Sequence, residues 1–255
     1  MTGLVRAEWT KLFTTRLWLG LLIGGCVLAG AFGALLTGFA GAAGQNGQPG
    51  LPPIGDPRFE QAALAVGGNA TALMLILGVI GMTQEYRHRT ATPTFLTTPR
   101  RGLVVLAKLI GYALVAIPFA LAIMAVGVLV VEIYAGARGA APPLSGDNLR
   151  VLLGVWAALV IYAVIGVGIG ALLRNQVGAV VGALVYLYVV EPVIRSVPAT
   201  APAFRWLPGG ALEAMTATLN ATDLLSPWQG GVLLLGYGLV AAVLGTFLAV
   251  RRDVV

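Results

Sequence analysis

The chain has 255 residues, of which 58% are hydrophobic and only 10% are charged, and its formal net charge is +6. A water-soluble globular chain usually carries about 25% charged residues, so this composition excludes a soluble domain. Thirty-five glycines and several apolar runs of bilayer length predict an all-α membrane protein with several spans. The lone cysteine, Cys26, excludes an intrachain disulfide.

The first segment, residues 2–16, is predicted to be an amphipathic helix lying in the membrane interface. Its helical spacing places four apolar side chains on one face: Val5, Trp9, Leu12 and Phe13. Arg6, Glu8 and Lys11 fall beside or behind that face. Trp9 and Lys11 are the expected interfacial anchors, since Trp favours headgroup depth. The alternative is a solvated lead-in to the first span. Nothing here resembles a cleavable signal peptide.

Six apolar runs are long enough to cross a bilayer, which takes about 20 residues. The predicted spans are 17–40, 62–82, 109–131, 151–173, 177–194 and 232–250. Three residues, 174–176, join the fourth and fifth spans as a tight hairpin. Residues 41–60 are rich in Gly and Pro and are expected to form an irregular outer loop. Residues 195–229 are predicted to form one or two short re-entrant helices in the outer membrane face.

The distribution of charge predicts the orientation. Eleven of the sixteen basic residues, but only three of the ten acids, fall on the side of the N-terminus. Basic residues favour the cytoplasm, so both termini are expected there. This unevenness also assigns the positive charge to topology and membrane lipid rather than to nucleic acid. The high content of Ala, Gly, Val and Arg is typical of a GC-rich bacterium, which indicates a bacterial cytoplasmic membrane.

The motifs of an enzyme are missing from the sequence. One histidine excludes a His-pair metal site, and there is no Walker A loop or cysteine cluster. The stretch "GVGIGA", residues 166–171, matches a relaxed dinucleotide fingerprint, but it lies inside the fourth span and is expected to serve packing. The pairs Gly166/Gly170 and Gly178/Gly182 have the spacing of close helix contacts. We therefore expect no catalytic residue, cofactor or metal on this chain.

Two features near the outer ends of the spans have functional alternatives. Glu191 and Arg195 lie four residues apart, so they can pair on one helical face, either as a structural ion pair or as an outer gate. Pro118 lies inside the third span and is expected to kink it, either statically or as a hinge. No carboxylate stands in the central region of any predicted span, which argues against ion-coupled transport.

The stretch "QEYRHRTATPTFLTTPRR", residues 84–101, interrupts the apolar pattern between the second and third spans. Glu85 and Arg89 favour a continued helix, and Thr92 with Pro93 favours the start of a new one. The resulting short helix exposes Phe95 and Leu96. One interpretation is that this helix docks on a partner protein. The other is a basic inner loop that contacts anionic lipid.

This stretch and its continuation resemble the first cytoplasmic loop of ABC-2-type permeases, the membrane subunits of ATP-binding-cassette exporters. The resemblance rests on one set of loop residues: Glu85, Tyr86, Arg87, Thr90, Pro99, Arg100, Arg101 and Lys108. The amphipathic start containing "EWTKLFTTR", the six spans and the semi-apolar segment before the last span extend it along nearly the whole chain. Arg89 stands where many relatives carry Gly, a departure that concerns the turn before Thr90.

The resemblance implies a coupling helix that fits a cleft on a separate ATPase subunit. Two permease chains, identical or related, and an ATPase dimer would make one exporter, with ATP and Mg bound by the ATPase. Phe95 and Leu96 would supply buried contact, and Glu85, Arg87 and Arg100 would orient it. The apolar spans favour a hydrophobic or amphipathic substrate such as a drug or lipid. The alternatives are a stand-alone secondary transporter and a non-transporting scaffold or sensor subunit.

Overall fold

The computed structural model describes residues 2–44, 50–87, 101–216 and 224–251, and it describes the side chains of these except at 101 and 248–251. Within these ranges the chain is mostly helical and contains no strand. Six helical runs are long and apolar enough to cross a membrane. The predicted all-α class and the count of six spans are therefore confirmed, and the chain is a multi-pass membrane protein.

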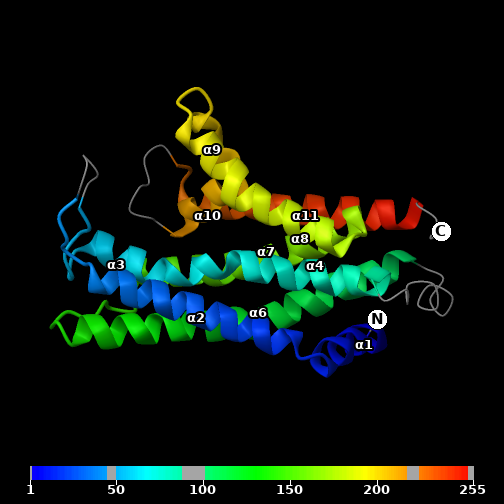
Figure 1. Ribbon diagram of the computed structural model, residues 1–255, viewed down its shortest axis with the longest axis horizontal. Coiled ribbons are helices and arrows are strands. Elements are labelled where there is room, and N and C mark those ends of the chain that lie inside the picture. Colours follow the sequence, from blue (N-terminus) through cyan, green and yellow to red (C-terminus); the bar gives the residue numbers. More distant parts are fainter. Residues whose placement is uncertain (1, 45–49, 88–100, 217–223, 252–255) are drawn as a thin grey trace.

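The described residues form a succession of helices along the chain. Their bounds are α1 Thr2–Thr14, α2 Leu17–Gly38, α3 Pro57–Leu64, η1 Ala65–Ala70, α4 Thr71–Arg87, α6 Arg101–Gly136, α7 Gly146–Leu173, α8 Gln176–Val185, η2 Tyr186–Val190, α9 Glu191–Ser196, η3 Ala201–Trp206, α10 Pro208–Thr216 and α11 Pro227–Arg251. α1 and the last turn of α11 lie at one end of the bundle (Figure 1), which we call the terminal end. The opposite end is the far end.

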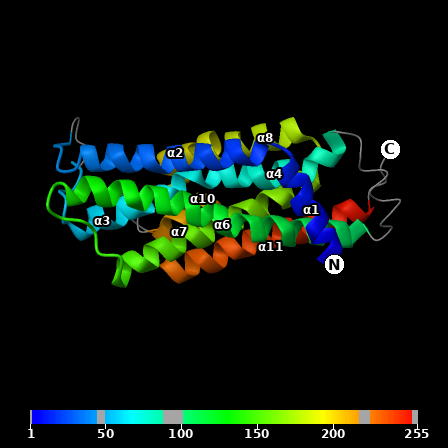
Figure 2. The ribbon, with the colours of Figure 1, turned by 90° about the horizontal axis from the view of Figure 1, so that it is seen from below.

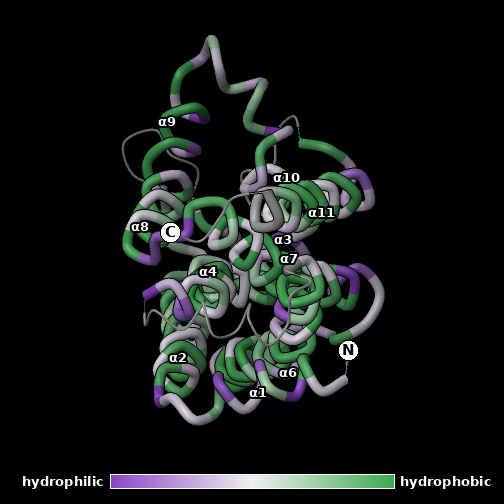
Figure 3. Tube along the Cα trace, turned by 90° about the vertical axis from the view of Figure 1, so that its right-hand side faces the viewer, coloured by the Kyte–Doolittle hydropathy of each residue, from purple (hydrophilic) through white to green (hydrophobic). Residues whose placement is uncertain are grey.

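α7 stands at the centre of the bundle, with α4, α6 and α11 packed around it (Figure 3). The apolar stretch of α7 is 61% buried inside the bundle, whereas that of the peripheral α2 is only 17% buried. The α8–η2–α9 run tilts away from the bundle toward the far end (Figure 1). α1 lies across the ends of the spans rather than along them (Figure 2).

Glycines in the fourth span explain why α7 occupies the centre. A Cβ at Gly166 would overlap the Leu75 carbonyl oxygen of α4, and one at Gly168 would overlap the backbone of Ala241 in α11. α7 therefore approaches a different helix backbone on each of two faces. This is the close packing expected for Gly166 and Gly170, and it accounts for "GVGIGA" without a nucleotide. The expectation for the other pair is wrong, because a Cβ at Gly182 would meet nothing within 4 Å.

The second span is broken into three parts. Asp56 caps α3 by accepting the backbone N–H of Arg58 at 2.7 Å, so helix begins at Pro57, inside the stretch expected to be irregular. The sequence AVGGNA then forms a 3-10 turn, η1, before α4 continues. Phe59 and Ala63 are buried against Val131 of α6, which fixes this outer part of the span.

Candidate functional site

Four charged side chains meet in a cluster at the terminal end, and we call it the charge cluster: Glu8 and Lys11 of α1, Glu85 of α4 and Lys108 of α6. The Lys108 ammonium lies 2.6 Å from Glu8 and 3.1 Å from Glu85. The Lys11 ammonium lies 2.8 Å from Glu8 and 2.6 Å from Glu85. Each acid thus contacts both bases, and the cluster is electrically balanced.

Lys108 is the most deeply placed member, with a fully buried side chain. It stands alone in the apolar run GLVVLAKLIGYALV, so only distant segments can supply its partners. Its ammonium contacts Glu8 and Glu85 and donates a hydrogen bond to the Gly81 carbonyl at 3.2 Å. An ammonium has three N–H donors, and three acceptors surround this one. A charge can remain buried when all of its hydrogen-bonding groups have partners.

α1 is held against α6 beside the cluster. The indole N–H of Trp9 donates to the Gly111 carbonyl at 3.2 Å, and Leu12 is buried. α1 also lies close to Gly111, since a Cβ at this position would be 3.5 Å from Glu8 and 3.9 Å from Trp9, an ordinary van der Waals distance. The helix predicted over 2–16 is therefore present, but it packs on the bundle as well as presenting an apolar face.

α1 turns Glu8 toward the bundle, a contact that the sequence did not predict. Glu8 was expected beside or behind the apolar face, yet it is only 5% exposed, whereas Trp9 is 41% exposed. The physical reason is the charge on Lys108, which an apolar contact would leave unpaired. Trp9 and Phe13 remain half-exposed at the surface of the terminal end, where they are free to contact lipid.

Lys11 completes the cluster from the more exposed side. Burial by itself lowers the pKa of Lys11, but its hydrogen bonds to Glu8 and Glu85 outweigh that effect, and the pKa lies above the ordinary 10.5. The side chain is therefore a cation at any physiological pH. The predicted interfacial anchor is thus also an ion-pair partner.

Three consecutive side chains at the end of α4 point in three different directions. Glu85 enters the charge cluster, and Arg87, the last residue of the helix, is exposed. Tyr86 lies under the guanidinium of Arg174, whose central carbon is 5.6 Å from the ring centroid. Arg174 belongs to the α7–α8 hairpin and adopts a left-handed conformation with φ 52°. This contact joins the predicted coupling segment to the central helix.

Most of the predicted coupling segment lies outside the described residues. That holds for Thr90, Phe95, Leu96 and Arg100, and for the short helix expected after Pro93. Arg101 is the first residue of α6. The described residues on either side, Arg87 and Arg101, connect directly to helices α4 and α6, which the charge cluster ties together.

Glu191 and Arg195 do not pair with each other as predicted. Arg195 forms its ion pair with Glu213 of α10 rather than with Glu191, and its guanidinium stacks on Phe204 at 5.0 Å. Glu191 is only 4% exposed and accepts the Gly209 backbone N–H at 3.1 Å. The two residues begin and nearly end the short α9, but α10 offers each a better partner. The predicted short helices before the last span exist as η3 and α10.

Sequence reasoning overlooked Glu8 and did not assign a role to Lys108 beyond the resemblance. A signal for both was present. An isolated lysine inside an apolar run has to find a carboxylate, and few acids are available near the expected cytoplasmic side: Glu8, Glu85 and Asp253. Two of these acids, Glu8 and Glu85, contact Lys108 in the structure.

No protein-family model matches the chain, and no curated protein is significantly similar to it. The charge cluster contains no group arranged to attack or transfer atoms. What it supplies is a mechanical connection among α1, α4 and α6 at the base of the predicted coupling segment.

Proposed function

We propose that this chain is the permease subunit of an ATP-binding-cassette exporter, driven by a separate ATPase that docks on residues 84–101. The observation that supports this most is the charge cluster. It joins three helices at the point where the predicted coupling segment leaves the spans. A force applied to that segment would reach α1, α4 and α6 together.

The physical requirement is a docking contact whose strength differs between two conformations. An ATPase that bound both conformations equally would shift neither. On this proposal ATP and Mg are held by the ATPase dimer, and two copies of this chain or two related chains form the path. Because buried, fully paired charges tolerate little rearrangement, the cluster would move as one body.

The orientation follows from the charge distribution. The terminal end carries most of the basic residues and is proposed to face the cytoplasm of a bacterial cell. The half-exposed Trp9 and Phe13 would then lie at the inner membrane interface, with lipid as their partner. An ATPase dimer, being cytoplasmic, has access to residues 84–101 only in this orientation.

Affinity purification from the native host membrane tests the proposal. Tagged wild-type chain is expected to retain an ATP-binding-cassette ATPase, identified by mass spectrometry, together with ATP hydrolysis. The double change Phe95→Asp and Leu96→Asp is expected to remove both, because two carboxylates cannot enter an apolar contact without a desolvation cost. His88→Ala, in the same segment, is the matched control and should retain both. Equal recovery of the ATPase with all three chains would contradict the docking assignment.

A proton-coupled secondary transporter is the second candidate, and the burial of Glu191 favours it. Buried acids within spans are typical of proton relays. This candidate predicts uptake or release driven by a pH gradient in vesicles holding the purified chain alone. The leading proposal predicts no such transport, and it requires the ATPase and ATP.

A further inference from the structure

A cavity of about 400 Å³ lies between the second, fourth, fifth and sixth spans. Its wall is nearly all apolar and includes Leu75, Ile165, Ile169, Leu187 and Ala241. Leu173, Val240 and Leu244 in the same wall are about half exposed, so the cavity opens sideways onto the lipid-facing surface. Its size is within the range of sites for small organic ligands.

Three tyrosines give this apolar cavity a polar, electron-rich part. Tyr162, Tyr186 and Tyr237 come from α7, η2 and α11, and all three line the cavity. The Tyr237 hydroxyl donates to the Trp206 carbonyl at 2.9 Å, which holds that ring in place. Aromatic rings gathered from several elements are the usual surroundings of quaternary ammonium groups.

Glu191 is a buried carboxylate close to Tyr162 and Tyr186. Its neighbours include the Gly209 N–H and the Tyr186 hydroxyl; Tyr186 is a wall residue of the cavity, and Gly209 follows the wall residue Pro208. Among the described side chains no basic group pairs with Glu191, because Arg195 is engaged by Glu213. A carboxylate has about four acceptor positions, so two neighbours leave capacity for a further partner.

A π-helical turn creates this juxtaposition. Residues five apart in an α-helix lie about 140° apart around the axis, so Tyr186 and Glu191 would face different directions. The turn η2 spans Tyr186–Val190, and the Glu191 N–H bonds the Tyr186 carbonyl. The wider turn brings both side chains to the same side. Such turns recur at functional sites.

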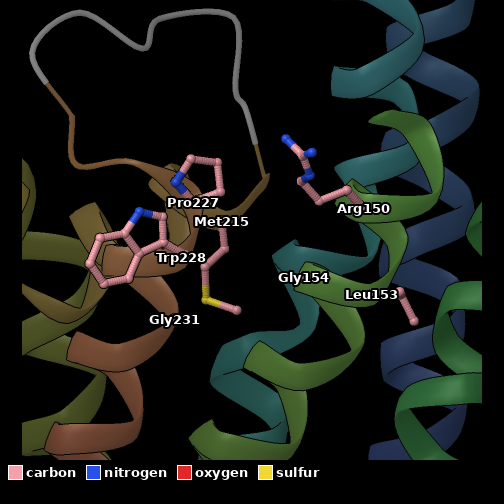
Figure 4. Close-up of a pocket in the computed structure, with 7 residues that line it drawn as sticks. All are labelled: Arg150, Leu153, Gly154, Met215, Pro227, Trp228 and Gly231. Carbon is pink, nitrogen blue, oxygen red and sulfur yellow. The ribbon is translucent and has the colours of Figure 1, made fainter. Parts of the chain in front are cut away.

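A second cavity, of about 580 Å³, lies at the far end between α7, α10 and α11 and lacks these features (Figure 4). Among its described wall residues the one charged side chain, Arg150, is exposed and pairs with Asp147 at 3.5 Å. None of these wall residues is a buried charge that a ligand would balance. The two cavities therefore differ in whether a buried charged group lies beside them, and such a group would select a charged ligand.

We propose that the tyrosine-lined cavity binds an amphiphilic organic cation, with its apolar body between α4, α7, α8 and α11 and its cationic group toward the tyrosines and Glu191. This deepens the proposed function by naming the cargo class. Only the description of the ligand as cargo rests on that function, because binding itself needs no ATPase.

Equilibrium binding of two ions of the same shape and opposite charge tests the proposal. The purified chain in detergent is titrated with radiolabelled tetraphenylphosphonium, a cation, and with tetraphenylborate, an anion. The cation is expected to bind saturably and more tightly than the anion. Glu191→Gln should weaken cation binding by about tenfold or more and leave the anion unchanged or tighter. Glu132→Gln, a matched neutralisation on α6, should change neither.

A second variant keeps the test decisive if Glu191→Gln fails to fold. Gly182 lines the cavity, and a Cβ there meets nothing within 4 Å, so Gly182→Phe places an aromatic ring at the cavity wall. It should weaken binding of both ions. Equal binding of the two ions by the wild type, or wild-type cation binding by either variant, would overturn the proposal. The purification of an ATPase is a separate measurement, so either proposal can fail alone.

Discussion

At the scale of single residues, the need to pair the buried charge of Lys108 determines how α1 packs at the terminal end. A fully buried ammonium is tolerated only with complete partners, and it has Glu8, Glu85 and the Gly81 carbonyl. That requirement turns α1 so that Glu8 faces the bundle. The residues involved lie up to 100 positions apart, so local pattern alone does not reveal them.

Replacing Lys108 by Met tests the importance of this charge. Lys108→Met keeps the side-chain volume but leaves Glu8 and Glu85 facing each other with Lys11 alone. We expect the free energy of unfolding in mixed detergent micelles to fall by about 3–5 kcal/mol, because an uncompensated buried charge remains. Arg150→Met, which breaks the exposed pair with Asp147, is the control and should cost at most about 1 kcal/mol. Similar losses for the two variants would show that the cluster is not a stabilising unit.

At the scale of helices, the six spans follow from hydropathy and length, but their interruptions do not. The predicted 62–82 span is a compound of α3, η1 and α4, because Gly67, Gly68 and Asn69 weaken regular helix while neighbouring helices still bury the segment. The π turn η2 was equally unpredictable, since valine and tyrosine carry no signal for it. Such features depend on which partner each face meets, and that is a tertiary property.

The glycines give a matched pair of variants for helix packing. Gly166→Ala places a methyl group against the Leu75 carbonyl of α4, and Gly182→Ala places one in open space. We expect the first to lower the free energy of unfolding by about 1–3 kcal/mol through overpacking. The second should be neutral or gain up to about 1 kcal/mol from helix propensity. Identical thermal unfolding midpoints for the two variants would contradict the close α4–α7 contact.

At the scale of the whole molecule, the charge cluster and the tyrosine-lined cavity occupy different levels of the same bundle. α4 links them, since Glu85 lies in the cluster and Leu75 in the cavity wall. α7 also reaches both levels, through Tyr162 in the cavity and, just beyond its last residue, Arg174 stacked on Tyr86. On the proposed function, a displacement of the predicted coupling segment would therefore have a continuous route to the cavity through packed helices.

The sequence predicted the fold class, the number of spans and the amphipathic first helix, because each depends on local composition and periodicity. It also singled out Glu85, Lys11 and Glu191 individually. It could not say that Glu85 and Lys11 share a cluster, or that Arg195 pairs with Glu213 rather than with Glu191, because these contacts depend on which helices pack together. The coupling segment itself remains a prediction, as Phe95 and Leu96 lie outside the described residues.

On the proposed function, an ATPase drives a conformational change in this chain through residues 84–101. The most direct test is a spin-label distance between α8 and α11, measured by double electron–electron resonance on the complex in nanodiscs. Cys26→Ser removes the native thiol, and Val181→Cys and Leu239→Cys place labels at exposed positions. The account predicts a distance that shifts on trapping with ATP and vanadate, and no shift with Phe95→Asp and Leu96→Asp. An unchanged distance in the wild-type complex, or the same shift in the double variant, would contradict it.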